Sequence, residues 1–199
     1  MNLIYLDNAA TTKLAQEVAD VMVPVLCEVY GNPSSSHAIG RKAKALVETS
    51  RRNIAKCLGC EPRSIIFTSG GTEADNLALR AAVKDLGCKR IVTSKAEHSA
   101  VIASAEKMSH LFEVEVVYVN HHPDGMVDCE HLKEILASGP KTLVSLMHAN
   151  NEVGVIQSLE IISKICRDAG AFFHSDTVQT MGHYPICLDA LDIDFLTCS

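Results

Sequence analysis

The sequence has no excess of basic residues and no apolar run long enough to span a membrane. Its 18 Lys and Arg are outnumbered by 24 Asp and Glu. No cluster of Lys and Arg alternates with aromatic residues, so nucleic acid is not an expected partner. Residues 1–7 have neither the cationic start nor the apolar stretch of a signal peptide. We therefore predict a cytoplasmic protein that does not bind membranes.

The sequence also lacks the pattern of a disulfide framework or of a zinc site. Its eight cysteines are expected to be thiols in a reducing compartment. Cys57 and Cys60 form one C-x-x-C pair, and no second pair stands at zinc-site spacing, which favours an incidental pair over a redox or metal site. Residues 120–131, NHHPDGMVDCEH, gather His, Asp and Cys side chains, but PDG is typical of a turn. We predict a solvated loop there and no metal site.

Apolar runs of strand length alternate with helical segments along most of the chain. Strands are predicted at residues 65–68, 90–94, 113–119, 142–147, 171–175 and 195–199. Their nearly continuous apolarity is typical of strands covered on both faces. Helices are predicted at residues 15–30 and 41–58, and the apolar period of residues 159–169 predicts another that ends at Gly170. The pattern predicts an α/β fold, a mostly parallel, doubly wound sheet with helices on both faces.

Polar side chains follow the predicted strands. In a doubly wound sheet, ligands bind beyond the carboxyl ends of the strands, so these side chains are expected to share one site. The candidates are Gly71 and Thr72 after the first strand, His98 after the second, Asn151 after the fourth, Asp176 and Gln179 after the fifth, and Ser199 at the end of the sixth.

The turn Ser69-Gly70-Gly71-Thr72 opens a predicted helix. Free backbone N–H groups and the helix dipole favour an anion at such a position. Glycine also serves simple strand-to-helix turns, so a phosphate site and a plain turn both remain open. The segment matches neither G-x-x-x-x-G-K-[ST] nor G-x-G-x-x-G, which disfavours a P-loop NTPase and a dinucleotide site. A phosphate held here would belong to another cofactor.

His98 and Asp176 suggest which cofactor that is. A carboxylate at a strand end can hold a protonated ring nitrogen, and an imidazole at a neighbouring strand end can stack on the ring and move protons. A phosphate, a ring nitrogen and a polar ring substituent facing Asn151 or Gln179 together describe pyridoxal phosphate. Taken singly, His98 is equally well a helix-start residue and Asp176 a turn residue. Their joint placement after different strands favours the cofactor.

Six ordered segments resemble the signatures of the cysteine desulfurases of the NifS/IscS type. These are fold type I, class V aminotransferase-like enzymes that use pyridoxal phosphate. The segments are YLDNAATT (5–12), YGNPSSSHAIG (30–40), FTSGGTEADNLAL (67–79), AEHSAV (96–101), MHANNEVGVIQ (147–157) and HSDTVQTMG (174–182). The resemblance runs over essentially the whole chain, and six signatures in order are more specific than any one of them.

The resemblance implies a role for each candidate residue. Thr72, the Gly71 backbone and Ser199 would hold the phosphate, while Asp176 would pair with the ring nitrogen. His98 would stack on the ring and act as the catalytic proton carrier, and Asn151 and Gln179 would contact the phenolic oxygen or the substrate side. The family reaction takes sulfur from L-cysteine, releases alanine and leaves a persulfide on an enzyme cysteine. Members are usually homodimers that pass sulfur to iron–sulfur cluster scaffolds or thiolation machinery.

The resemblance also implies that part of the family pattern lies beyond residue 199. In the family, the strand matching DFLTCS is followed by a His-Lys pair whose lysine forms the Schiff base, so the chain is expected to be an incomplete large domain and inactive alone. Residues 1–14 are expected to join the small domain and residues 15–199 to form the cofactor-binding large domain. Three alternatives remain open: another class V enzyme, such as an aminotransferase or a kynureninase-like hydrolase; a selenocysteine lyase; and a non-catalytic scaffold.

Overall fold

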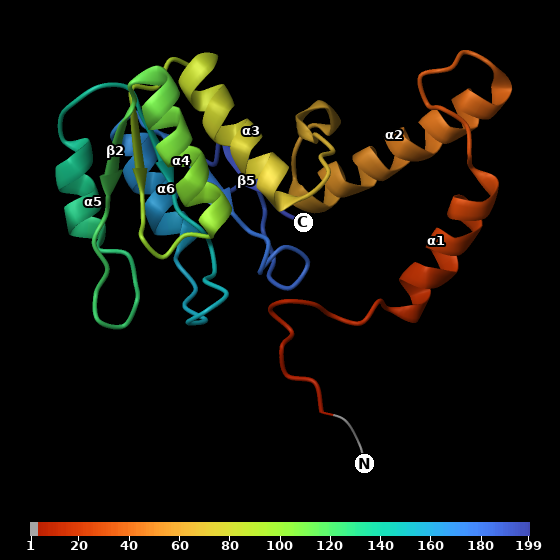
Figure 1. The fold of residues 1–199 in the computed structure, drawn as a ribbon, viewed down its shortest axis with the longest axis horizontal. Helices are drawn as coiled ribbons and strands as arrows, with labels where there is room; N and C mark the ends of the chain where they lie inside the picture. Colours follow the sequence, from red (N-terminus) through yellow and green to blue (C-terminus); the bar gives the residue numbers. More distant parts are fainter. Residues whose placement is uncertain (1–3) are drawn as a thin grey trace. The chain divides into compact units, whose positions relative to one another are not determined.

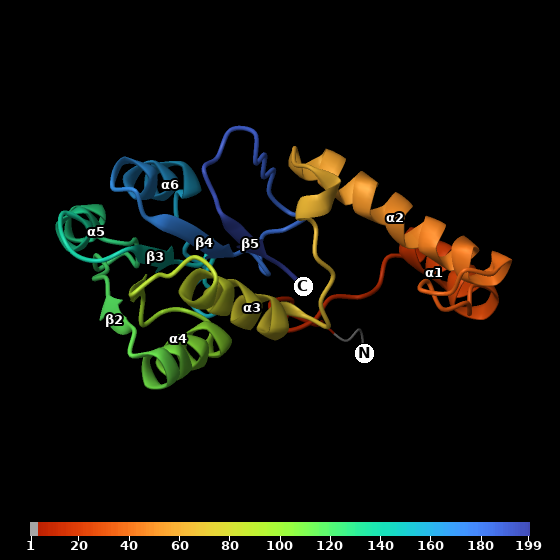
Figure 2. The same ribbon diagram turned by 90° about the horizontal axis from the view of Figure 1, so that it is seen from above.

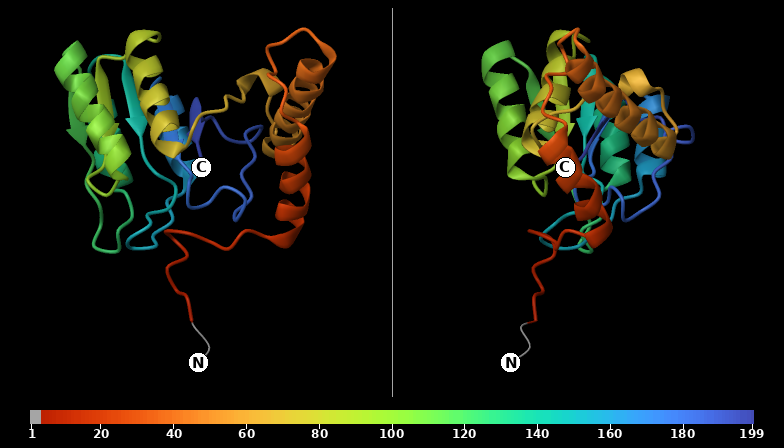
Figure 3. Two further views of the ribbon diagram at one scale, coloured as in Figure 1. Left: turned by 45° about the vertical axis from the view of Figure 1, so that its right-hand side comes forward. Right: turned by 90° about the vertical axis from the view of Figure 1, so that its right-hand side faces the viewer.

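The computed structural model describes residues 4–199, which divide into two compact units with the boundary between Ile66 and Phe67. The first unit contains two helices, α1 (Gln16–Glu28) and α2 (Ala38–Leu58), and a single 3₁₀ turn, η1 (Pro62–Ser64). Figure 1 labels α1 and α2, and Figure 3 shows from two further sides the loop that joins them. Both helices were predicted, and each boundary lies within three residues of the predicted one.

The ends of α2 follow from its sequence. His37 accepts a hydrogen bond from the Gly40 N–H at the start, and Gly59, with φ of 68°, ends the helix in the left-handed conformation. In α1, by contrast, no residue is buried, and five apolar side chains are exposed: Val18, Val21, Met22, Val23 and Leu26.

The second unit is built on a five-stranded parallel sheet. Its strands are β1 (Arg90–Thr93), β2 (Glu115–Tyr118), β3 (Thr142–Ser145), β4 (Phe172–Asp176) and β5 (Phe195–Thr197), in the order β2-β1-β3-β4-β5. Every paired strand runs parallel to its neighbour. The predicted parallel sheet is therefore confirmed for five of the six predicted strands.

Helices cover both faces of this sheet. Figure 2 shows α3 (Gly71–Lys84) and α4 (Ser99–Phe112) on one face and α5 (Cys129–Leu136) and α6 (Leu159–Asp168) on the other. Each face has its own apolar core: Leu79, Val101 and Leu143 contribute to the first, and Leu132, Ile162 and Phe173 to the second. The doubly wound arrangement is thus confirmed, because successive residues of a strand point to opposite faces and both faces are covered.

The predicted strand at residues 65–68 is wrong. These residues lie outside the sheet, and in the described part of the chain no strand pairs with them. Ile66 is 68% exposed and Phe67 is 49% exposed. A short apolar run becomes a strand only where a neighbour accepts and donates its backbone hydrogen bonds, and periodicity in the sequence does not reveal whether that neighbour exists.

The loop after β2 is the turn that its sequence predicts. Gly125 has a φ of 86°, and an antiparallel bridge joins His121 to Val127. Asp128 accepts hydrogen bonds from the first backbone N–H groups of α5 and so caps that helix. Within residues 4–199 no group of three His, Cys, Asp or Glu side chains is arranged to hold a metal ion.

Two further findings concern the cysteines and the length of the helices. None of the eight cysteines forms a disulfide in the described part of the chain. From residue 4 to residue 199, no helix combines the length and the apolar character needed to cross a membrane.

The sheet core predicts a clear difference between two leucine substitutions. Leu143 in β3 is fully buried, whereas Leu111 at the end of α4 is 59% exposed. Leu143→Ala leaves a cavity in the core and is expected to lower the free energy of unfolding by about 2–5 kcal/mol, whereas Leu111→Ala should change it by less than about 1 kcal/mol. Urea unfolding of the natural protein and both variants measures this. Equal losses would contradict the assignment of Leu143 to the core.

Candidate functional site

The carboxyl edge of the sheet is held together by hydrogen bonds between the loops that follow neighbouring strands. These bonds join residues at or shortly after the ends of β1, β3, β4 and β5. They join the Glu97 carboxylate to the Met147 N–H at 3.0 and 3.1 Å, the Asp176 carbonyl to the His148 N–H at 2.9 Å, and the Thr197 carbonyl to the Thr177 N–H at 2.8 Å. Because these hydrogen bonds join each loop to its neighbour, they fix the positions of the polar residues along the edge of the sheet.

The start of α3 lies against the end of β5. No side chain caps this helix, whose first residue is Gly71. A Cβ atom on Gly71 would lie 3.1 Å from Val178 Cγ2 and 3.6 Å from Ser199 Cβ. The structure therefore brings Gly71 and Ser199 together. Because Gly71 has no side chain, the first turn of α3 can lie close to Val178 and Ser199. Uncapped N–H groups beside a hydroxyl make a suitable site for an anion.

Asp176, the last residue of β4, is a buried carboxylate at the same edge. Burial raises its pKa, and the nearby Asp75 carboxylate raises it further, whereas the Val178 N–H, His174 and His98 lower it. Its Oδ1 accepts the Val178 N–H at 2.9 Å. A carboxylate that costs free energy to ionise in place gains most from a positively charged partner, such as a protonated ring nitrogen.

His98 caps the start of α4 beside this carboxylate. Its Nδ1 accepts the Ala100 N–H at 3.2 Å, so the ring is oriented by the helix that it begins. The side chain is exposed, and it is near enough to Asp176 to lower the pKa of that carboxyl. With Nδ1 used as an acceptor, the neutral ring carries its hydrogen on Nε2, which is the nitrogen able to donate a proton.

The other predicted residues lie at this edge in three separate segments of the chain. Thr72 is exposed in the first turn of α3, and Gln179 is half-buried in the turn after β4. Asn151 is half-buried, and its Nδ2 donates to the Glu152 carboxylate at 2.9 Å. Its loop is built by Asn150, whose Nδ2 donates to the Ala96 carbonyl at 2.6 Å and so ties this loop to the one that carries His98.

Sequence reasoning missed several buried polar residues behind the edge. Glu97, Asp75, His174 and Thr197 were given no role. One signal for His174 was available, because an ionisable residue inside an apolar strand two positions before Asp176 shares its face of the sheet.

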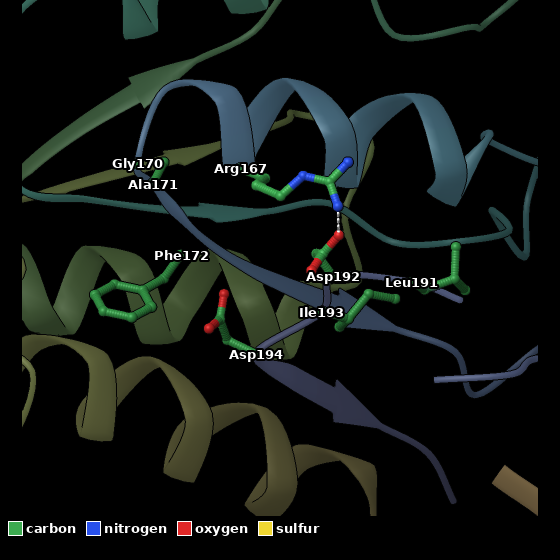
Figure 4. Close-up of a pocket in the computed structure, with 8 residues that line it drawn as sticks. All are labelled: Arg167, Gly170, Ala171, Phe172, Leu191, Asp192, Ile193 and Asp194. Atoms are coloured by element: carbon green, nitrogen blue, oxygen red, sulfur yellow. Dashed lines mark hydrogen bonds and ion pairs between the residues drawn. The ribbon is translucent and has the colours of Figure 1, made fainter. Parts of the chain in front are cut away.

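A pocket in the second compact unit lies away from the candidate site. It surrounds the amino ends of β4 and β5, opposite to the edge described above, and contains the ion pair between Arg167 and Asp192 (Figure 4). Both partners are exposed, so the pair is worth little. None of the candidate site residues lines this pocket.

Glu97 predicts how the stability of the protein changes with pH. Burial raises the pKa of its carboxyl from the ordinary value of 4.5 to about 8, although the Met147 N–H and the Ser94 hydroxyl lower it. The folded state therefore keeps a proton that the unfolded state releases above pH 4.5. The contribution of protonated Glu97 to the free energy of unfolding is complete below pH 4.5. It is lost as the pH rises to about 8, by at most about 1.4 kcal/mol per pH unit.

The variant Glu97→Gln tests this because its amide oxygen can still accept the Met147 N–H but does not titrate. We expect the free energy of unfolding to fall less steeply between pH 4.5 and 8 in the variant than in the unmodified natural protein. Urea unfolding at several pH values measures both slopes. Parallel slopes would show that Glu97 is already ionised in the folded protein.

Comparisons with known proteins agree on one family. The class-V aminotransferase profile matches residues 4–199. The cysteine desulfurase IscS of Dictyoglomus turgidum is 43% identical over 198 residues, which are 98% of this chain and 50% of that protein. IscS of Neisseria meningitidis is 42% identical over 200 residues, 98% of this chain and 49% of that protein. The chain spans about half the length of the curated relatives that it matches.

Solved structures give the same result. A NifS-like protein from Rickettsia africae superposes with a TM-score of 0.88 at 39% identity, covering 100% of this chain and 54% of that one. The protein SspA, solved in complex with cysteine, superposes with a TM-score of 0.90 at 32% identity, covering 98% and 56%. The predicted resemblance to the NifS/IscS type is confirmed, and with it a fold and a cofactor, pyridoxal phosphate, shared by this group of enzymes. The chain belongs to the class-V aminotransferase family.

Proposed function

We propose that the natural protein containing this chain is a cysteine desulfurase, which removes sulfur from L-cysteine to give alanine and an enzyme persulfide. One observation carries the proposal: an uncapped helix start, a hydroxyl and a buried carboxylate meet at one sheet edge, beside an exposed imidazole, in a chain about 40% identical to IscS proteins. The homodimer, the iron–sulfur scaffold or other sulfur acceptor, and the cytoplasmic location remain part of this proposal.

The residues at the edge fit pyridoxal phosphate. The phosphate suits the N–H groups at Gly71, the Thr72 hydroxyl and the Ser199 hydroxyl, since Gly71 and Ser199 lie together and no side chain caps the helix start. The nearby Glu73 carboxylate accepts the Ser69 N–H, one residue before the N-cap Gly70. The ring nitrogen suits Asp176, whose burial makes an unpaired negative charge costly. Asn151 and Gln179 lie in the loops after β3 and β4, where they would contact the phenolic oxygen or the substrate side of the ring.

Each group then has a physical task. When bound, the cofactor supplies an electron sink for bond breaking at the amino acid. Asp176 holds a proton on the ring nitrogen by its negative charge, which keeps the ring electron-poor. His98 would stack on the ring face, and because its Nδ1 accepts the Ala100 N–H, the neutral imidazole carries its hydrogen on Nε2, the atom that would donate a proton. Two hydrogen bonds, from the Met147 N–H to Glu97 and from Asn150 to the Ala96 carbonyl, hold the loop before His98 against the loop after β3.

The activity test uses the natural protein with pyridoxal phosphate, L-cysteine and a thiol reductant. We expect alanine and sulfide in equal amounts, and Asp176→Ala should lower kcat/KM about a hundredfold or more, because a buried charged partner is lost. Formation of a keto acid in place of alanine would support an aminotransferase, and release of selenide alone from selenocysteine would support a selenocysteine lyase. No product from any of these substrates would contradict an enzymatic role.

Gly71→Ala tests the phosphate site on its own. The added Cβ would lie 3.1 Å from Val178 Cγ2, so the helix start or Val178 must shift by a few tenths of an ångström. We expect pyridoxal phosphate to bind about tenfold more weakly, while pyridoxal without the phosphate binds as before. Cofactor absorbance during titration measures both affinities. Equal weakening for the two ligands would place the phosphate elsewhere.

A further inference from the structure

Four buried polar side chains form a hydrogen-bonded network between α3 and the sheet, and we call them the Asp75 network. Its members come from one helix and three strands and are at most 5% exposed: Asp75 in α3, Ser145 in β3, His174 in β4 and Thr197 in β5. Helix α3 packs against these strands. The network therefore joins the helix to each of the three strands that end at the candidate site.

The contacts of the network assign its hydrogen atoms. Thr197 Oγ1 donates to Asp75 Oδ1 at 2.6 Å. A hydroxyl has a single hydrogen, so Thr197 Oγ1 accepts at its other contact, with His174 Nε2 at 3.1 Å. His174 Nε2 therefore carries a hydrogen, and it lies 3.6 Å from Asp75 Oδ1. The other ring nitrogen, Nδ1, lies 2.8 Å from Ser145 Oγ.

The members of the network lie close in sequence to the proposed cofactor contacts and share their elements. Asp75 is one helical turn after Gly71, and His174 and Asp176 are alternate residues of β4 that share one face of the sheet. Thr197 contacts α3 at Asp75, while Ser199 lies close to Gly71. The bond between Asp75 and Thr197 therefore fixes the helix start against the end of β5, and the His174 contact relates both to the Asp176 strand.

A purely structural role does not explain this choice of residues. Burying charged and polar groups costs solvation free energy, and apolar residues of similar volume often stabilise a core equally well. The Asp75 carboxylate also raises the pKa of Asp176. The network constrains geometry: its hydrogen bonds fix the distance of α3 from β5 and the distances between the neighbouring strands β3, β4 and β5.

We propose that Asp75, His174 and Thr197 are positioning residues that set the distance between the phosphate-binding start of α3 and the Asp176 carboxylate. Pyridoxal phosphate is then held at both ends at once, with its phosphate at Gly71 and its ring nitrogen at Asp176. This inference rests on the proposed function. The residues do not touch the cofactor themselves, and they act through α3 and β4.

Thr197→Val is the direct test, and the chain offers a matched control. Thr142 in β3 is equally buried and has the same double role, since its Oγ1 accepts from Arg90 Nε at 3.0 Å and donates to the Pro140 carbonyl at 2.8 Å. It lies at the amino end of its strand, at the opposite edge from the site. Thr197→Ser keeps the hydroxyl and serves as the conservative variant.

The measurements are the affinity for pyridoxal phosphate and the ¹⁵N resonance of its labelled ring nitrogen, at one pH, in the natural protein. With Thr197→Val we expect about tenfold weaker binding and a resonance shifted toward the unprotonated ring. Thr197→Ser should retain both properties. Thr142→Val should lose stability yet bind the cofactor with unchanged affinity and resonance. Equal effects of the two valine variants on cofactor binding would overturn the inference.

A second measurement does not depend on the folding of any variant. The ¹⁵N resonances of the His174 ring in the unmodified protein should show a hydrogen on Nε2. An Nε2 without a hydrogen would overturn this inference and leave the proposed function standing. Failure of the unmodified protein to bind pyridoxal phosphate would instead overturn the proposed function together with this inference. The two failures are therefore distinguishable.

Discussion

The hydrogen bonds that join the loops at the carboxyl edge of the sheet are the constraint on which the candidate site depends. In a parallel sheet every strand ends at the same edge, and every loop must turn there to reach the next helix. Backbone groups in those turns have lost their ladder partners and need new ones. Here the Met147, His148 and Thr177 N–H groups donate to the neighbouring strand or to the loop that follows it. The polar residues that project from these loops are positioned as a consequence.

Charge burial gives this edge its chemical character. Asp75, Glu97 and Asp176 bring carboxyl groups into a region that excludes water, and each copes with the cost differently. Glu97 keeps its proton up to about pH 8 because burial raises its pKa, Asp75 is matched by the Thr197 hydroxyl and the His174 ring, and Asp176 remains without a cationic hydrogen-bond partner within residues 4–199. A site with one such carboxylate is prepared for a ligand that brings its own positive charge.

The family gives these features a context. The class-V profile matches 4–199, and relatives of the NifS/IscS type share both sequence and fold with the chain over about half of their own length. All residues proposed to contact the cofactor lie in the second compact unit, after Phe67. The elements of that unit therefore supply the groups suited to the phosphate, the ring nitrogen and one face of the ring.

The sequence by itself determined the local elements and the residues at their ends. Apolar runs, the Gly170 stop and the Gly-Gly turn predict four helices and five of the six strands, because hydrophobic periodicity and backbone conformation act over a few residues. The order of the signatures predicts the family and the cofactor. Only the tertiary structure decided which apolar run finds a partner, so residues 65–68 are no strand, and which residues far apart in the chain meet. The contacts of Glu97 with Met147 and of Asp75 with Thr197 join segments 50 and 122 residues apart. No local pattern encodes such pairs, since they follow from the packing of α3 on the sheet and from the parallel order of its strands.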